Sequence, residues 1–148
     1  MKILVLGAGK QGSATAYDLL RNPAITQVGI VDASAEAVES LRASLGDRRD
    51  SIECVDGLET ETLTEILHPY DACFNAVGET AALEVTRAAI ASHTHLCDLG
   101  GSGAHLARQS EMNVLAFESG VTIVPGCGLA PGLASLLAGP AIRRLEET

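Results

Sequence analysis

The segment Gly7–Gly12 carries three glycines in the spacing G-x-G-x-x-G, directly after the apolar run of residues 3–6. A helix-like segment follows the glycines, and Asp32 stands twenty residues beyond Gly12, at the end of a second apolar run. The glycine spacing alone is a weak signal, because short glycine patterns also occur by chance in turns. With a strand before it, a helix after it and an acid at this distance, it is the fingerprint of a dinucleotide-binding turn.

Each residue of this fingerprint has a mechanical role. Gly7 lets the chain turn sharply out of the strand, Gly9 leaves room for a pyrophosphate, and Gly12 lets the helix pack closely. The start of the helix then presents free N–H groups and a partial positive charge to the phosphates. Asp32 is expected to accept hydrogen bonds from the adenosine ribose and to repel a 2′-phosphate. The pattern therefore predicts NAD as the cofactor and disfavours NADP.

Apolar runs alternate with segments of helical period along the whole chain. The expected strands cover residues 2–6, 26–31, 52–55, 71–76, 94–98 and 121–124, and the expected helices cover residues 10–21, 34–45, 60–67, 79–92 and 104–119. Strict alternation predicts an α/β protein with a parallel sheet, right-handed crossovers and helices on both faces. Together with the first turn, it predicts a doubly wound Rossmann fold with six parallel strands in the order 3-2-1-4-5-6.

The composition excludes several classes of partner. Hydrophobic residues make up 47% of the chain and aromatic residues 3%, which predicts a core of Ala, Val, Ile and Leu. The net charge of −9 argues against nucleic acid or an anionic membrane as a partner. The four cysteines form no C-x-x-C pair and no secretory leader is visible, so reduced thiols and a cytoplasmic location are expected. The apolar stretch 121–142 contains three prolines and is not expected to span a membrane.

The last part of the chain differs from a self-contained domain. Residues 1–132 are expected to form the dinucleotide-binding domain, and residues 133–148 a connecting helix toward a substrate domain absent from this chain. The apolar face of that helix consists of Leu133, Leu136, Leu137, Ile142 and Leu145. A face of this kind normally packs on further structure or on a partner. A second domain is therefore expected, and a homo-oligomer is possible.

Ligands of an open parallel sheet bind beyond the carboxyl ends of its strands, where small and acidic residues predominate in this sequence. For Asp56, a turn or helix cap is an equally good interpretation, and Lys10 either reaches a phosphate or faces solvent. Besides the fingerprint, the cofactor-binding residues expected there are Lys10, Gln11, Asp56, Asn75, Ala76, Val77, Gly78, Asp98 and Gly100.

Histidines and cysteines gather near the fifth and sixth expected strands. His95 and Cys97 share one strand face, but no spacing matches a known zinc pattern, so no metal site is expected. His105 is interpreted as surface of a first helical turn rather than as a proton carrier. Cys127, in a glycine-rich loop, is the only thiol considered for function. None of these residues identifies a catalytic acid or base.

Four runs of the chain resemble the cofactor domain of the saccharopine dehydrogenase and lysine 6-dehydrogenase family. They are Lys2–Gly12, Asp71–Gly78, Thr94–Gly101 and Val121–Leu137. The most specific part is the ending, which reads G-V-T-I-V-P-G-C-G-L-A-P-G from residue 120. The run D-L-G-G from residue 98 is most similar to the lysine 6-dehydrogenase branch.

The resemblance implies an NAD(P)-dependent oxidoreductase of lysine metabolism that acts on the C–N bond of an amino acid. A hydride passes from the amine carbon of lysine or saccharopine to the nicotinamide, and water hydrolyses the resulting imine. Gly7, Gly9, Gly12 and Asp32 carry over as cofactor contacts. Enzymes of this family continue into another domain that supplies most of the substrate pocket, so this chain is expected to be the cofactor-binding half.

Two other functions fit parts of the sequence. A non-catalytic NAD-sensing regulatory module of the potassium-transport type has a similar length, a glycine fingerprint and an acid after the second strand. Such modules give no reason for the segments Asp98–Gly101 and Pro125–Gly132, which favours the dehydrogenase. A domain of this fold that has lost its nucleotide and serves as an interaction module is disfavoured by the intact fingerprint.

Overall fold

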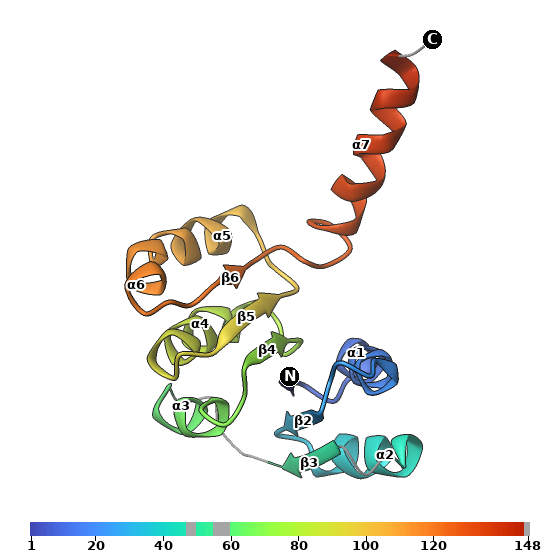
Figure 1. Cartoon of the computed structure of the whole chain (residues 1–148), viewed down its shortest axis with the longest axis vertical. Helices are drawn as coiled ribbons and strands as arrows, with labels where there is room; N and C mark the ends of the chain where they lie inside the picture. The colour runs from blue at the N-terminus through green and yellow to red at the C-terminus, as the bar shows by residue number, and fades with distance from the viewer. Residues whose placement is uncertain (47–49, 55–59, 147–148) are drawn as a thin grey trace.

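The computed structural model describes residues 1–46, 50–54 and 60–146. Within these residues the strands β1 to β6 form one sheet in which every pairing is parallel, in the order β3-β2-β1-β4-β5-β6 (Figure 1). The strands are β1 (Lys2–Leu6), β2 (Gln27–Asp32), β3 (Asp50–Cys54), β4 (Ala72–Asn75), β5 (His95–Asp98) and β6 (Ile123–Val124). The strand order reverses between β1 and β4, and a ligand crevice is expected at that point of an open parallel sheet.

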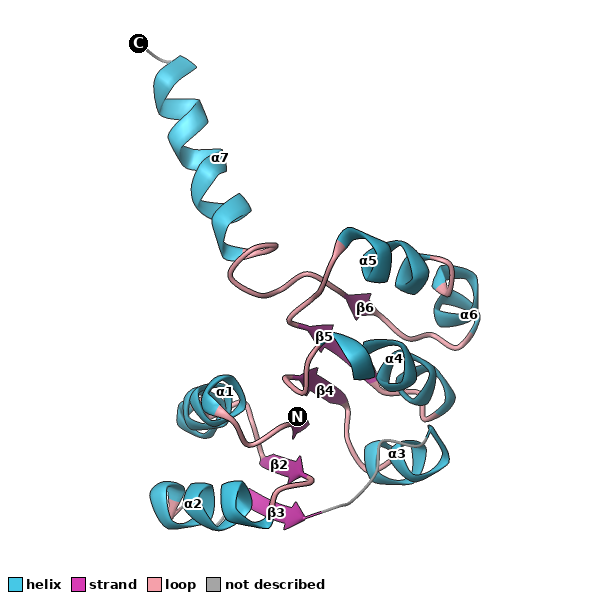
Figure 2. Cartoon of the chain, turned by 180° about the vertical axis from the view of Figure 1, so that it is seen from behind, coloured by secondary structure: helices cyan, strands magenta, loops and turns pink. Residues whose placement is uncertain are grey.

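Helices cover both faces of this sheet. They are α1 (Lys10–Arg21), α2 (Ala35–Leu45), α3 (Thr60–Leu67), the 3₁₀ turn η1 (Glu79–Ala81), α4 (Ala82–Ala91), α5 (Gly103–Ser110), α6 (Asn113–Glu118) and α7 (Leu133–Glu146). Figure 2 shows α1 and α2 on one side of the strands, and α3, α4, α5 and α6 on the other. The predicted α/β fold, with a parallel sheet between two helical layers, is therefore confirmed.

Two apolar clusters hold these layers together, because successive residues of β1 point to opposite faces of the sheet. Val5 packs with residues of α1, β2 and α2, including Leu20, Ile30 and Leu41. Leu4 and Leu6 pack on the other side, with residues of α3, α4 and β5 that include Leu63, Leu67, Val85 and Leu96. Aliphatic residues dominate both clusters, as the low aromatic content predicts.

Two expected helices are interrupted. The segment expected as one helix over 79–92 begins with the 3₁₀ turn η1 and continues as α4. The segment expected as one helix over 104–119 is divided into α5 and α6. Met112 has φ −86° and ψ 3°, which lie outside the α-helical region, so the helical hydrogen-bond series ends at that residue. Helical period alone did not predict either break.

The sixth strand is shorter than expected. Residues 121–124 read as a strand in the sequence, but only Ile123 and Val124 belong to β6. The N–H of Val121 donates to the carbonyl of Ala116 at 2.8 Å, which closes the end of α6. The N–H of Thr122 donates to Nδ1 of His95 at 3.0 Å instead of to the backbone of β5. Both groups are therefore bonded outside the strand ladder.

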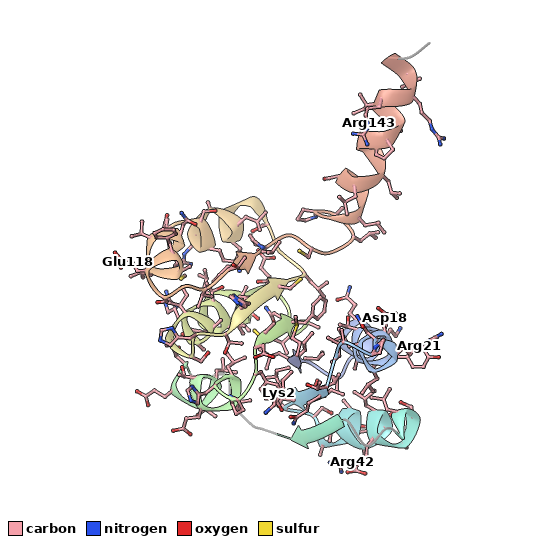
Figure 3. All side chains as sticks on the ribbon, in the orientation of Figure 1. Lys2, Asp18, Arg21, Arg42, Glu118 and Arg143 are labelled. Carbon is pink, nitrogen blue, oxygen red and sulfur yellow. The ribbon has the colours of Figure 1, made fainter. Side chains whose placement is uncertain are left out.

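The helix α7 extends away from the sheet and its helical layers (Figure 1). The apolar side chains that the sequence places on it are all exposed, from 47% for Leu133 to 77% for Leu145. Figure 3 shows Arg143 on α7, and Arg21 and Arg42 on α1 and α2, at the outside of the molecule. Among the described helices, none is both long enough and apolar enough to cross a bilayer.

Candidate functional site

The turn between β1 and α1 requires glycine at two positions for reasons of packing. Gly7 has φ +103°, and a Cβ on it would lie 3.1 Å from the backbone carbonyl of Ala76. A Cβ on Gly12 would lie 1.8 Å from the carbonyl oxygen of Gly7. The close contact of Gly12 is thus with the turn itself, so α1 can begin directly over the end of β1 only if this position has no side chain.

Gly9 differs from these two glycines. It precedes α1 with φ −68° and ψ −172°, an extended conformation that residues other than glycine adopt readily. Among the described residues, a Cβ on Gly9 would meet no atom within 4 Å apart from those of its two chain neighbours. Neither backbone conformation nor packing therefore requires glycine here. The open space above Gly9 lies at the first turn of α1, where N–H groups without helical partners can bind an anion.

Asp32 joins the end of β2 to the glycine turn. Its Oδ2 accepts a hydrogen bond from the N–H of Ala8 at 2.6 Å, and its Oδ1 accepts one from the N–H of Ser34 at 2.7 Å. A carboxylate oxygen has more than one acceptor position, so both oxygens retain capacity for a hydroxyl donor. Asp32 is also partly exposed. Its carboxylate is therefore held in place by the protein and accessible to a ligand.

A cleft of about 370 Å³ lies at this edge of the sheet. Two sides of the cleft are formed by the glycine turn and by the end of β2, and a third by α3. Its lining residues are Leu6, Gly7, Gly9, Val31, Asp32, Ala33, Leu63, Ile66, Ala76 and Val77. The structure thus brings together the predicted residues Gly7, Gly9, Asp32, Ala76 and Val77. Leu63 and Ile66 were not predicted as lining residues, because helical period indicates α3 but not which cleft it borders.

Other predicted residues lie near the cleft without lining it. Lys10 and Gln11 are exposed on the first turn of α1, and Gly78 is exposed after β4 with φ +96°. Asn75 is only 1% exposed, and its Oδ1 accepts a hydrogen bond from the N–H of Val77 at 3.2 Å. Its Nδ2 is a buried donor without a protein partner in the described part of the chain, a state that a bound molecule would relieve. Asp56 falls in the segment 55–59, outside the described residues.

Asp98 and Gly100 were expected as cofactor contacts, but both are engaged within the protein. The carboxylate of Asp98 is buried, and it accepts hydrogen bonds from the N–H of Gly100 at 2.9 Å and from Nε2 of Gln109 at 2.7 Å. Gln109 also donates to Oγ1 of Thr86 at 3.1 Å. Gly100 has φ +89°, and a Cβ on it would lie 2.7 Å from Cα of Gly126. These residues connect β5 to α4, α5 and the loop after β6.

A polar cluster at the carboxyl ends of β4 and β5 was missed in the sequence. Oε1 of Glu79 accepts hydrogen bonds from the N–H of Ser102 at 3.0 Å and from its hydroxyl at 2.5 Å, and it forms an ion pair with Nδ1 of His105. The bonds from Ser102, and after them His105, lower the pKa of Glu79 below its usual value of 4.5. His105 therefore lies on the first turn of α5, as expected, but it is bound to the carboxylate of Glu79 at the start of η1.

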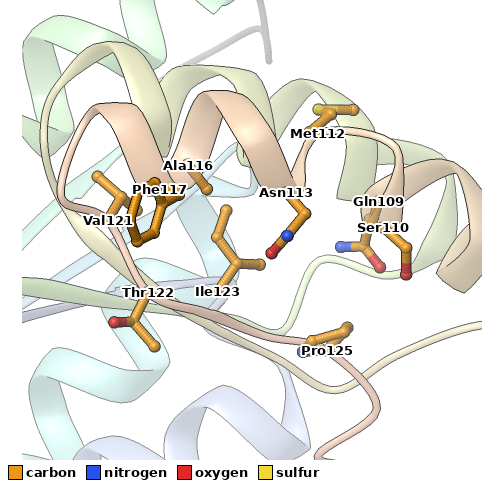
Figure 4. A pocket seen from close by; sticks show the side chains of 10 residues that line it. All are labelled: Gln109, Ser110, Met112, Asn113, Ala116, Phe117, Val121, Thr122, Ile123 and Pro125. Atoms are coloured by element: carbon orange, nitrogen blue, oxygen red, sulfur yellow. The ribbon is translucent and has the colours of Figure 1, made fainter.

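A second cavity, of about 490 Å³, lies beside β6 and away from the glycine turn (Figure 4). Figure 4 shows Phe117 and Asn113 of α6 on one side of it and Ile123 and Pro125 on the other. None of the predicted cofactor residues lines it. In the described ranges, no three His, Cys, Asp or Glu side chains lie close enough together to hold a metal ion.

Comparison with known proteins connects this geometry to a family. A sequence profile described as the saccharopine dehydrogenase NADP binding domain matches residues 3–124. The fold is similar to that of apo saccharopine dehydrogenase (L-Glu forming) from Saccharomyces cerevisiae, with a TM-score of 0.79 and 21% identity. That match covers 99% of this chain and 31% of the yeast chain.

More distant matches share the fold and include two dinucleotide complexes. GenD2 from gentamicin A biosynthesis, solved with NAD, has a TM-score of 0.63 and 19% identity over 85% of this chain and 34% of its own. A 3-ketoreductase mutant from Actinomadura kijaniata, solved with TDP-benzene and NADP, has a TM-score of 0.60 and 15% identity over 84% of this chain and 38% of its own. The chain thus spans about a third of the length of these solved structures.

Proposed function

We propose a function from one premise: the chain belongs to the family of saccharopine dehydrogenase NADP-binding domains. It is an NAD(P)-binding domain of an oxidoreductase of the saccharopine dehydrogenase type. Within that class, the proposed role is to bind NAD for the oxidation of an amino acid at its C–N bond. The proposed substrate is of the lysine or saccharopine type. The proposed donor is the CH–NH group of that substrate.

The open space above Gly9 is the observation that carries this proposal. A Cβ at Gly9 would touch nothing in the described protein beyond its chain neighbours, so glycine at this position leaves room for a ligand. The first α-helical bond of α1 is donated by Ser13 to the carbonyl of Gly9 at 2.8 Å. The N–H groups before Ser13 therefore lie in the unsatisfied first turn, where a pyrophosphate is stabilised by hydrogen bonds and by the helix dipole.

The rest of the cleft fits the adenosine part of a dinucleotide. Leu63 and Ile66 of α3 form an apolar wall on which a planar base can pack. Asp32 lies within the same cleft, so its carboxylate is available to the ribose hydroxyls.

The preference for NAD over NADP rests on charge. The family is named for NADP, but none of the residues that line the described cleft carries a positive charge, and Asp32 carries a negative one. A 2′-phosphate carries a charge of about −1.5 to −2 at neutral pH. Repulsion between unit charges about 4 Å apart is about 1 kcal/mol in water and about 4 kcal/mol at a protein surface. This corresponds to at least a fivefold preference for NAD.

In the proposed reaction this chain binds and orients the cofactor. The nicotinamide, when bound, accepts the hydride that leaves the amine-bearing carbon. The glycine turn and Asp32 would hold the adenosine diphosphate end of the cofactor. Residues 1–132 are proposed as this cofactor-binding unit, and residues 133–148 as the connection to a second domain that binds the amino acid. Self-association through the exposed face of α7 is a further part of the proposal.

Isothermal titration calorimetry of the chain with NAD, NADH and NADP tests this proposal. The expected result is binding of NAD and NADH, with NADP at least fivefold weaker, and a smaller difference in the Asp32→Asn variant. Asp18, a charged residue on the outside of α1 (Figure 3), provides the matched control, because Asp18→Asn removes the same charge away from the cleft. A clear preference for NADP in the unaltered chain would overturn the role of Asp32.

A further inference from the structure

Two cysteines from different segments meet at the carboxyl end of β5, outside the cleft of the fingerprint. Cys97 pairs with Val124 in the register between β5 and β6. After a turn at Pro125 and Gly126, the N–H of Cys127 donates to the carbonyl of Asp98 at 2.8 Å. This backbone bond holds Cys127 beside the residue that follows Cys97, and the Cys127 side chain lies within hydrogen-bonding range of the Cys97 thiol.

The two thiols differ in how easily solvent reaches them. Cys127 is exposed, and its Sγ contacts the carbonyl oxygen of Val124 at 3.4 Å. Cys97 is half-buried. Burial, and after it the hydrogen bond with Cys127 and the negative charge of the Cys127 thiolate, raise the pKa of Cys97 to about 12. Cys97 therefore stays protonated beside an accessible partner.

We propose that Cys97 and Cys127 form an oxidation site, at which a hydroperoxide converts the two thiols into a disulfide between β5 and the loop Pro125–Gly132. This site is separate from the cofactor cleft, and the proposal does not depend on which cofactor the chain binds. In the described part of the structure the two thiols have no third ligand that would complete a metal site. A thiol pair without a metal is available for oxidation.

The reaction begins at the accessible thiol. The thiolate of Cys127 attacks one oxygen of the hydroperoxide and the O–O bond breaks, which leaves a sulfenic acid on Cys127 and releases water or an alcohol. The sulfur of Cys97 then attacks the Cys127 sulfur, the S–O bond breaks and a second molecule leaves as water. The two thiols lose two electrons, the peroxide gains them, and both thiol protons end in the released products.

The change at Cys127 promotes the second step. Part of the raised pKa of Cys97 comes from the charge of the Cys127 thiolate. A sulfenic acid at Cys127 is neutral, so this repulsion is absent after the first step and Cys97 ionises more readily. Cys73 offers a contrast, because it is buried and its neighbouring thiol, Cys97, is only half-exposed. Burial, and after it the charges of Asp98 and Cys97, raise the pKa of Cys73 to about 12. Cys73 is expected to remain reduced.

Peptide mapping of the unaltered chain tests the proposal without relying on any variant to fold. Trypsin places Cys97 in the peptide 88–108, Cys127 in the peptide 109–143, and both other cysteines in the peptide 50–87. The folded protein is treated with hydrogen peroxide at low concentration, the remaining thiols are blocked with N-ethylmaleimide, and the monomer band of a non-reducing gel is digested. The expected product is 88–108 linked to 109–143, which dithiothreitol separates again.

Two variants provide the comparison. Cys127→Ser is expected to lose the linked product, whereas Cys73→Ser, the matched control, is expected to retain it. The proposal is overturned if Cys127 is oxidised to sulfinic or sulfonic acid without the link, or if both thiols stay reduced. Linkage of 50–87 to either other peptide, or a link found only between two chains, also overturns it.

Discussion

Gly9 and Gly12 belong to the same motif, but the structure predicts opposite consequences for replacing them. Gly9→Ala adds a Cβ that meets no atom of the described part of the chain within 4 Å beyond its neighbours in sequence, in a backbone conformation open to alanine. Loss of glycine from the unfolded chain stabilises by about 0.4–1 kcal/mol, and the poorer preference of alanine before a helix costs a similar amount. The free energy of unfolding is therefore expected to change by less than about 1 kcal/mol.

Gly12→Ala places a Cβ 1.8 Å from the carbonyl oxygen of Gly7 and 2.8 Å from its carbon. Both are backbone atoms, so α1 or the glycine turn has to move. Overpacking of this kind typically costs about 1–3 kcal/mol, and a backbone clash this short is expected at the upper end. Urea unfolding followed by circular dichroism measures both variants against the unaltered chain.

Replacement of Gly9 is also expected to weaken the binding of NADH. A methyl group on Gly9 enters the space proposed for the pyrophosphate, so Gly9→Ala is expected to weaken binding at least tenfold, or about 1.4 kcal/mol. Gly9→Val is expected to abolish measurable binding while the protein remains folded. Gly103, whose Cβ would also meet nothing within 4 Å, is the matched control, because it lies on α5 and does not line the cleft.

The reasoning is refuted if Gly9→Val binds NADH with unchanged affinity, because the pyrophosphate then lies elsewhere. It is also refuted if Gly9→Val destabilises the chain as much as Gly12→Ala. In that case the glycine serves the fold, and its presence says nothing about a ligand.

Three further predictions concern stability and activity. Gln109→Leu leaves the buried carboxylate of Asp98 without its side-chain donor and is expected to destabilise the chain by about 1.5–3 kcal/mol in urea unfolding, whereas the exposed Ser110→Ala is expected to change little. Because hydrogen bonds lower the pKa of Glu79 in the folded state, its contribution is present above the unfolded value of 4.5 and is lost as the pH falls through the lower folded pKa. Glu79→Gln is therefore expected to lower the melting temperature at neutral pH, with the difference shrinking at acid pH; a difference independent of pH would contradict this. The chain alone is expected to show little lysine-dependent reduction of NAD in a spectrophotometric assay, and robust turnover would contradict the need for a second domain.

The local pattern of apolar and polar residues predicted most of the helices and strands, because it reflects which side chains are buried. The run from Ile3 to Leu6 is apolar throughout, since a central parallel strand packs against helices on both faces. The bounds of α1 and α3 agree with those expected from the sequence. The short β6 was not predicted, because it depends on which partners the N–H groups of Val121 and Thr122 find in the folded chain. Helical period also gave no sign of the break at Met112.

In the candidate site, too, some residues were predicted from the sequence and others depend on tertiary contacts. Gly7, Gly9 and Asp32 were predicted from their spacing, because one turn and one crossover bring them together in any fold of this class. Asp98 follows a strand in the same way, yet its carboxylate is bound to Gln109, and nothing in the sequence around Asp98 indicates where α5 will pack. The spacing of residues along the sequence therefore predicts a site when one turn and one crossover bring its residues together. It does not predict contacts with a helix that packs from elsewhere in the chain.

By itself, the sequence determined the parallel α/β architecture, the glycine turn with its acid, and the family, because strand burial and turn geometry are properties of short segments. Only the tertiary structure decided which glycines serve packing and which leaves space for a ligand. It also paired Glu79 with His105, Asp98 with Gln109 and Cys97 with Cys127. These contacts join segments far apart in the chain. They form only when the helices and loops pack at the carboxyl ends of the strands.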